Sequence, residues 1–158
     1  MTLAERFEEA LTFATRLHAT QTRKGGDIPY IAHLLGVTSI ALEYGATEDQ
    51  AIAALLHDAM EDQGGRPTLE KIREKFGPEV ADIVEHCSDS DVDTKTGRKK
   101  PWRQRKKTYI ENLSGAPPSV LLVSAADKLH NARTILADYR VLGDDLWPRF
   151  NGKKKGTL

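Results

Sequence analysis

Cysteine is almost absent from this sequence: Cys87 is the only one, so no disulfide can form within the chain. Net charge is absent too, because 23 lysines and arginines balance 23 aspartates and glutamates. Overall charge therefore favours neither a nucleic acid nor a membrane as a partner. The longest apolar runs, 51–56 and 120–123, are far shorter than the roughly 20 residues of a membrane-spanning helix. We expect a cytoplasmic protein with no membrane partner and no specific nucleic-acid partner.

Residues that interrupt helices are few. The chain has 12 glycines and 7 prolines in 158 residues, too few for collagen or low-complexity disorder, and every proline falls at the edge of a helical segment. The alternation typical of half-buried strands is missing, and apolar residues instead recur at steps of three or four. This pattern, over a length typical of one domain, predicts an all-α, single-domain helical bundle spanning residues 1–158.

The periodicity also places the individual helices. A threonine precedes two of them as a candidate N-cap: Thr2 before the first, and Thr47 before a segment in which Gln50 completes a capping box. Two stretches break the periodicity, a basic loop over 20–29 and a segment over 89–101 that we expect to be mobile. The predicted helices cover residues 3–17, 31–44, 47–61, 69–76, 80–84, 102–113 and 119–140.

Two of the predicted helices are apolar on every side and then change character. Residues 51–56 lead directly into His57 and Asp58. Residues 120–126 lead into Asp127, which lies on the same helical stripe as the apolar positions. Carboxylates at the depth of a helical core are costly unless a cation or strong donors compensate them. Because the first of these helices contains no lysine or arginine, the compensating charge must come from elsewhere.

The acids near the end of the first helix repel one another. Asp58 and Asp62 lie one turn apart with Glu61 beside them, a like-charge arrangement that destabilises a helix. If the second buried helix brings Asp127 to the same place, partial desolvation increases the repulsion. A bound divalent cation reverses the sign of this interaction. The sequence therefore predicts a metal site.

The predicted ligands are two imidazoles and two carboxylates. His57 and Asp58 can flank one ion from adjacent positions, and Asp127 comes from the second buried helix. His33, on the helix after the basic loop, supplies the second imidazole. Nitrogen and oxygen donors without thiolate suit Mn²⁺, which we expect, with Fe²⁺, Co²⁺ and Zn²⁺ as alternatives.

Candidate acid–base groups lie one turn beyond these ligands. Water on a divalent ion becomes a nucleophile near neutral pH, and Glu61 and Asp62 are placed to orient or deprotonate it. The alternative for this pair is a solvated last turn of the helix. For the four predicted ligands, the alternative is histidines satisfied within the core and acids at helix ends.

Three segments resemble the HD-domain metal phosphohydrolases. Residues 30–33 (YIAH), 54–62 (ALLHDAMED) and 126–133 (ADKLHNAR) are similar to the hydrolase domains of RelA/SpoT-type enzymes and to the small alarmone hydrolases. The resemblance covers residues 5–140 and implies the same metal ligands and the same acid pair. The implied reaction removes the 3′-pyrophosphate from guanosine tetra- or pentaphosphate and gives GDP or GTP.

The resemblance also implies residues that bind the nucleotide. Arg23 and Lys24 match a basic pair that meets the base and the phosphates, and Asn131 matches an asparagine near the nucleoside. A phosphate-binding lysine of the family has no direct counterpart in this chain. We expect Arg103 or Lys100 to replace it.

Two other functions stay open at this point. One is an HD hydrolase for a different phosphorylated nucleotide, such as a deoxynucleoside mono- or triphosphate or NADPH. The other is a non-catalytic helical module that binds nucleotides or RNA through the basic run from Lys95 to Lys107. A homodimer also stays open. His18, His86 and His130 have no partner at useful spacing and are interpreted as structural or surface residues.

Overall fold

The computed structural model of the chain describes residues 2–89 and 100–157. Within those ranges it contains helices and no strand, apart from one isolated β-bridge, and this confirms the all-α prediction. The segment expected to be mobile, 89–101, falls mainly on residues 90–99, which lie outside the described residues. Across the described chain, no helix is both long enough and apolar enough to cross a bilayer.

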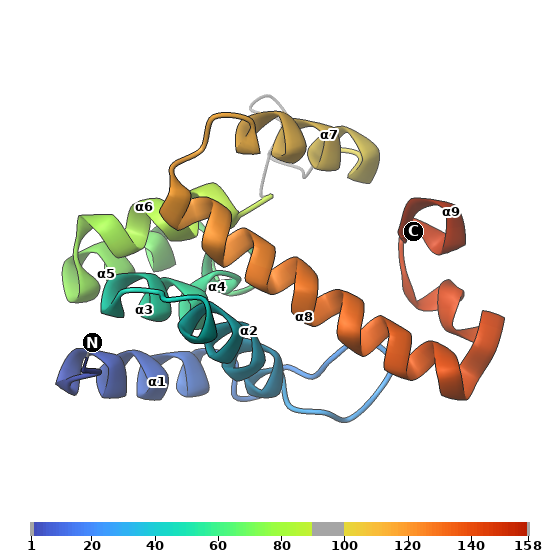
Figure 1. Ribbon diagram of the computed structural model, residues 1–158, viewed down its shortest axis with the longest axis horizontal. Helices are drawn as coiled ribbons and strands as arrows, with labels where there is room; N and C mark the ends of the chain where they lie inside the picture. Colours follow the sequence, from blue (N-terminus) through green and yellow to red (C-terminus); the bar gives the residue numbers. More distant parts are fainter. Residues whose placement is uncertain (1, 90–99, 158) are drawn as a thin grey trace.

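Most of the described residues lie in helices, and every helix expected from the periodicity has a counterpart (Figure 1). The predicted helix over 47–61 is divided in two, and two short helical segments follow the longest helix. In chain order the elements are α1 (Glu5–Leu17), α2 (Ile31–Glu43), α3 (Glu48–Leu56), α4 (Ala59–Asp62), α5 (Arg66–Phe76), α6 (Pro78–Cys87), α7 (Trp102–Leu113), α8 (Pro118–Leu142), the 3₁₀ helix η1 (Gly143–Arg149) and α9 (Lys153–Thr157).

The core is built around α3, which packs against α1, α2, α6 and α8. Every side chain from 51 to 56 is buried, as the sequence predicted for a helix that is apolar on all sides. The equivalent prediction for residues 120–126 is wrong in part. Leu121 is 42% exposed and Ala125 is exposed, because α8 packs one face against α2, α3 and α6 and leaves another face open.

The two predicted N-caps have different outcomes. The capping box is confirmed: Gln50 N donates to Thr47 Oγ1 at 3.3 Å, and Thr47 N donates to Gln50 Oε1 at 3.0 Å. Thr2 is not a cap, because α1 begins later and its N-cap is Ala4. The amide of Ala4 donates to Glu48 Oε1 at 2.7 Å. A side chain of α3 therefore accepts a hydrogen bond from the backbone at the start of α1, and no local sequence pattern predicts this contact.

The chain interrupts its helix at the end of α3, which differs from the continuous helix predicted over 47–61. α3 ends at Leu56, and the single turn α4 begins at Ala59. Asp58, between them, has φ −93° and ψ −3°, the bridge region of backbone space in which many active-site residues lie. No glycine or proline marks this place in the sequence, so tertiary packing sets the interruption.

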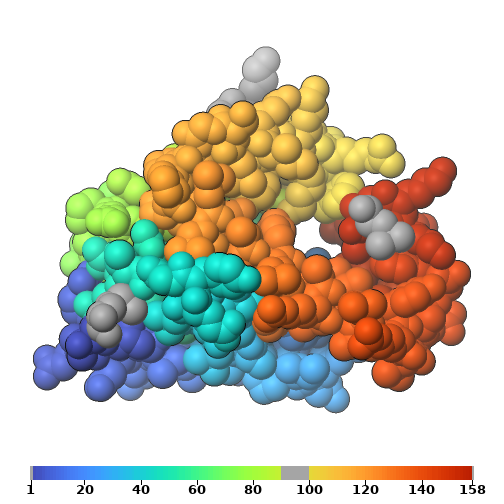
Figure 2. All heavy atoms as spheres, in the orientation of Figure 1, coloured from blue at the N-terminus to red at the C-terminus, as the bar shows by residue number. Residues whose placement is uncertain are grey.

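A further layer, α7, lies over the N-terminal half of α8 (Figure 1). The hydroxyl groups of Tyr109 and Ser124 are 2.6 Å apart and join the two helices. At the start of α7, the Trp102 ring lies so close to Gly152 and Gly156 that a Cβ on Gly152 would come within 2.8 Å of it. The C-terminal segment therefore contacts α7, and Figure 2 shows the hollow that these segments and α8 leave between them.

One buried and one exposed leucine allow a test of this core. Leu55→Ala removes a fully buried side chain and is expected to lower the free energy of unfolding by about 2–5 kcal/mol. Leu121→Ala removes the same atoms from a side chain that is 42% exposed, and the expected loss is about 1 kcal/mol or less. Urea denaturation followed by circular dichroism measures both values. Equal losses for the two variants would contradict the packing around α3.

Candidate metal centre

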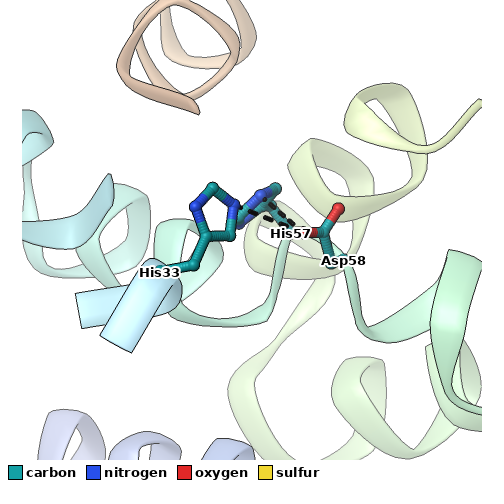
Figure 3. A group of neighbouring side chains, drawn as sticks. All are labelled: His33, His57 and Asp58. Atoms are coloured by element: carbon teal, nitrogen blue, oxygen red, sulfur yellow. Dashed lines mark ion pairs between the residues drawn. The ribbon is translucent and has the colours of Figure 1, made fainter. Parts of the chain in front are cut away.

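Two helices bring two imidazoles and a carboxylate together. His33 comes from α2, and His57 and Asp58 directly follow α3, so the three side chains point toward one another (Figure 3). Asp58 Oδ2 is 3.0 Å from His57 Nε2 and 3.5 Å from His33 Nε2. One ligand atom from each residue lies within 4.8 Å of the others, so the three can bind a single ion.

Asp127 of α8 joins the same group. Its Oδ1 is 3.3 Å from His33 Nε2 and 3.7 Å from His57 Nε2, so each imidazole faces both carboxylates through Nε2. Both histidines and Asp127 are buried, whereas Asp58 is partly open to solvent. The structure thus brings all four predicted ligands together, from α2, α8 and the end of α3.

The hydrogen bond of His57 Nδ1 decides which ring nitrogen faces the two carboxylates. Its Nδ1 lies 2.9 Å from the carbonyl oxygen of Ala54 and donates to it, because a carbonyl can only accept. In the neutral imidazole, Nε2 then carries a lone pair, and this buried atom cannot donate to the carboxylate oxygens that face it. A buried lone pair directed at two carboxylates is unfavourable without a cation. A divalent metal ion fits this arrangement.

The pKa shifts of the group indicate the same demand for positive charge. Burial alone would lower the pKa of His57, yet Asp58 and Asp127 raise it well above the usual value. Burial alone would raise the pKa of each carboxyl group, but the neighbouring imidazoles lower the pKa of Asp58 and of Asp127 well below the usual value. All three pKa shifts show that positive charge between these side chains is favourable. A proton provides part of this charge, and a divalent ion provides more.

Each carboxylate of the group is held by further donors. The Tyr30 hydroxyl donates to Asp58 Oδ2 at 2.6 Å. Burial, followed by the charge of Asp58, raises the pKa of Tyr30, so the phenol stays protonated. On α8, Lys128 Nζ donates to Asp127 Oδ2 at 2.5 Å, and the Asn131 amide donates to Asp127 Oδ1 at 2.6 Å. These contacts fix the orientation of both carboxylates.

The two acids expected to act on water have different surroundings. Asp62 Oδ2 accepts a hydrogen bond from Gln21 Nε2 at 2.7 Å, which ties it to the loop before α2. Glu61 has contacts on the side of α7. Its Oε1 is 3.7 Å from Arg105 Nη1, and its Oε2 accepts from the backbone amide of Asp89 at 3.4 Å. The two carboxylates are therefore not interchangeable.

One of the two predicted substrate residues of the basic loop contacts the side chains that hold the proposed ligands in place. These ligands, His33, His57, Asp58 and Asp127, are called the metal group below. Arg23 Nη2 donates to Asn131 Oδ1 and to Thr134 Oγ1, each at 3.1 Å. Because Asn131 also donates to Asp127, the loop, α8 and the metal group share one set of hydrogen bonds. Lys24, next in the loop, is exposed. The structure thus brings Arg23 and Asn131 together and leaves Lys24 open to solvent.

On α7 the inward-facing cation is Arg105, whereas Arg103 is exposed. The Arg105 side chain is 10% exposed, pairs with the Asp89 carboxylate and lies near Glu61. Two positions along a helix differ by about 200° in direction, so the two arginines cannot face the same side. Buried Tyr109, one turn after Arg105, is the sequence signal that could have identified the inward face.

All three histidines without an expected partner have one in the structure. The exposed His86 places its Nδ1 2.7 Å from the carbonyl oxygen of Asp82, one turn earlier in α6. His18 is buried, with its Nδ1 2.7 Å from Gln21 Oε1 and its ring stacked on Tyr30. His130 lies against His33, with 2.9 Å between the two Nδ1 atoms. Burial, then the charges of His33 and Arg23, lower the pKa of His130 to about 4, so this imidazole is neutral at pH 7. The contact of His130 with His33 and the stacking of His18 on Tyr30 join different elements, so spacing along one helix does not reveal them.

These observations describe an all-helical domain with a histidine–aspartate metal group at the end of a buried helix. A family profile described as an HD domain matches residues 10–156, and the chain belongs to the HD domain family. Members of this family bind a divalent metal ion, and the grouping of His33, His57 and Asp58 agrees with that property.

Curated relatives are similar over most of this chain. It is 38% identical over 130 residues to guanosine-3′,5′-bis(diphosphate) 3′-pyrophosphohydrolase MESH1 of Xenopus tropicalis, covering 80% of this chain and 68% of that protein. It is 37% identical over 134 residues to the guanosine-3′,5′-bis(diphosphate) 3′-pyrophosphohydrolase of Aquifex aeolicus, covering 84% of this chain and 18% of that protein. The chain thus spans about two thirds of MESH1 and less than a fifth of the Aquifex protein.

Solved structures share the architecture. One is described as a metazoan ortholog of SpoT that hydrolyzes ppGpp and plays a role in starvation responses. It matches with a TM-score of 0.74 at 27% identity, over 99% of this chain and 92% of that chain. A second, lmo0812 from Listeria monocytogenes EGD-e, matches with a TM-score of 0.63 at 32% identity, over 84% of this chain and 75% of that chain.

Proposed function

We propose that this protein is a metal-dependent phosphohydrolase that removes the 3′-pyrophosphate from guanosine tetra- and pentaphosphate. Water attacks the phosphorus atom bonded to the 3′-oxygen, the bond between that oxygen and phosphorus breaks, and the 3′-oxygen takes up a proton. The products are GDP or GTP and pyrophosphate. The similarity to MESH1, whose name states this reaction, supports the choice of substrate.

The observation that carries the proposal is the meeting of four nitrogen and oxygen donors at one point. The proposed ligands are His33, His57, Asp58 and Asp127, whose facing atoms are 3.0–3.7 Å apart. This donor set suits Mn²⁺, which we propose as the ion. When bound, a divalent ion supplies Lewis acidity for both the phosphate and the water.

The chain itself supplies orientation and proton transfer. Asp62, held by Gln21, is proposed to accept the proton of the attacking water. Glu61, held by Arg105 and the Asp89 amide, is proposed to orient that water. The two roles are assigned from these contacts. Asp62 contacts the neutral amide of Gln21, whereas Glu61 lies beside the cation of Arg105.

Basic side chains and an amide are proposed to bind the nucleotide. Each substrate carries a 3′-diphosphate and a 5′-di- or triphosphate, and cations that offset this charge stabilise the transition state. Arg23 and Asn131 adjoin the metal group and are proposed to contact the nucleoside. Lys24, which is exposed next to Arg23, is proposed to contact the phosphates. Arg103 is exposed and faces away from the side of α7 on which Arg105 lies near Glu61, so the phosphate contact expected of it is not proposed.

A substrate panel tests this proposal. Mn²⁺-loaded protein is incubated separately with guanosine tetraphosphate, a dNTP, a dNMP and NADPH, and the products are separated by ion-exchange chromatography. We expect equal amounts of GDP and pyrophosphate from guanosine tetraphosphate, with turnover that EDTA stops and added Mn²⁺ restores. Faster release of orthophosphate or of a nucleoside from another compound would contradict the substrate, and binding without hydrolysis would contradict the activity.

A further inference from the structure

His130 contacts His33, a proposed metal ligand, at the ring nitrogen of His33 that faces away from the metal group. Its Nδ1 is 2.9 Å from Nδ1 of His33, and the two rings meet at 61° with centroids 4.8 Å apart. The other ring nitrogen of His33, Nε2, faces Asp58 and Asp127. His33 therefore lies between His130 and the proposed ion.

The distance between the two Nδ1 atoms constrains their protons. One nitrogen must donate and the other accept, because two N–H groups or two lone pairs repel each other at this separation. If His33 Nδ1 accepts, the proton of the neutral ring sits on Nε2 and blocks that atom as a ligand. If His33 Nδ1 donates, Nε2 carries the lone pair that a metal needs. Only the second arrangement allows His33 to bind an ion.

Gly36 of α2 makes room for this contact. It lies in the interior of a helix, three residues after His33, where glycine costs about 0.5–1 kcal/mol relative to alanine. A Cβ at this position would lie 2.2 Å from His130 Nε2 and 2.3 Å from its Cδ2. The imidazole of His130 therefore occupies the volume of the missing side chain.

We propose that His130 is a positioning residue: its Nδ1 accepts a hydrogen bond from His33 Nδ1 and directs the Nε2 lone pair of His33 toward the ion, and Gly36 is required to seat it. The proposal rests on the proposed metal site but not on the identity of the substrate. α8 then supports the site twice, through Asp127 and through the contact between His130 and His33. Partners of this kind typically change metal affinity by about ten- to a hundredfold.

Substitutions of His130 separate the hydrogen bond from packing. His130→Asn keeps an acceptor near the position of the imidazole Nδ1, whereas His130→Leu fills a similar volume without one. Mn²⁺ affinity is measured by isothermal titration calorimetry without nucleotide, and thermal melting checks the fold. We expect His130→Leu to weaken Mn²⁺ binding by about ten- to a hundredfold and His130→Asn to stay within about threefold of the unmodified protein.

Gly36 provides an independent test. Gly36→Ala should displace His130 and weaken Mn²⁺ binding by a similar factor, although alanine is the better helix former. In the His130→Ala background the new Cβ has space, so Gly36→Ala should leave Mn²⁺ affinity unchanged there and raise the melting temperature.

Two results would overturn the proposal: unchanged Mn²⁺ affinity in both His130→Leu and Gly36→Ala, or an equal effect of Gly36→Ala with and without the His130 imidazole. Both leave the unmodified protein binding Mn²⁺, and so leave the proposed function standing. An unmodified protein that binds no divalent metal would overturn the metal site and this proposal with it.

Discussion

Asp58→Ala is expected to abolish divalent-metal binding and to lower hydrolysis by at least about a thousandfold. Asp58 Oδ2 is 3.0 Å from His57 Nε2 and 3.5 Å from His33 Nε2, so its loss removes one of the two carboxylates that face both imidazoles. The helices should persist, because Asp58 follows α3 and the buried side chains around α3 are unchanged. Calorimetry with Mn²⁺, pyrophosphate release and far-UV circular dichroism measure the three quantities.

A matched control separates this effect from the loss of any acid. Asp145→Ala removes a carboxylate from an exposed position in η1 and should leave metal binding and turnover unchanged. Asp127→Ala should behave like Asp58→Ala, since Asp127 faces the same two imidazoles. Full turnover by an Asp58→Ala protein that has been treated with a chelator would contradict the proposed mechanism.

Asp62→Asn is expected to lower kcat by about 10²- to 10⁴-fold while the affinity for Mn²⁺ is retained. The amide cannot accept the proton of the attacking water, although it keeps the size of the carboxylate and can still accept a hydrogen bond from Gln21, which holds Asp62 at 2.7 Å. Because Asp62 is not among the proposed ligands, metal binding should be insensitive to the change. Steady-state kinetics with guanosine tetraphosphate and calorimetry with Mn²⁺ make the comparison.

Two further variants sharpen the assignment. Asp145→Asn is the exposed control and should match the unmodified protein. Glu61→Gln should lower kcat less than Asp62→Asn does, because Glu61 is proposed to orient the water and not to take its proton. A loss of Mn²⁺ affinity in Asp62→Asn, with kcat restored at saturating metal, would show that Asp62 acts as a ligand and not as the base.

The metal group could be predicted because burial along a helix is visible in the sequence. Residues 51–56 are apolar at every position, so the acid that follows them must lie near the core, and the structure buries all six. Asp127 could be predicted in the same way, from its place on the stripe of Val120 and Val123, although α8 is exposed on another face. His33 could be predicted only as part of the set, from its place on the helix after the basic loop, since a single histidine there is more often a core or surface residue than a metal ligand.

Contacts between elements could not be predicted from spacing along one helix. The interruption at Asp58 and the cap that Glu48 gives to α1 both depend on tertiary packing. The contact of His130 with His33 joins α8 to α2, and the only local sign of it is Gly36, a glycine inside an otherwise regular helix. A glycine that local geometry does not require can thus mark a side chain arriving from elsewhere.

The most direct test of the account is an anomalous difference map from crystals grown with Mn²⁺. We predict one strong peak at about 2.0–2.2 Å from Nε2 of His33, Nε2 of His57 and a carboxylate oxygen of each aspartate. A peak at any other place, or none at these four side chains, would contradict the claim that they hold a single catalytic ion.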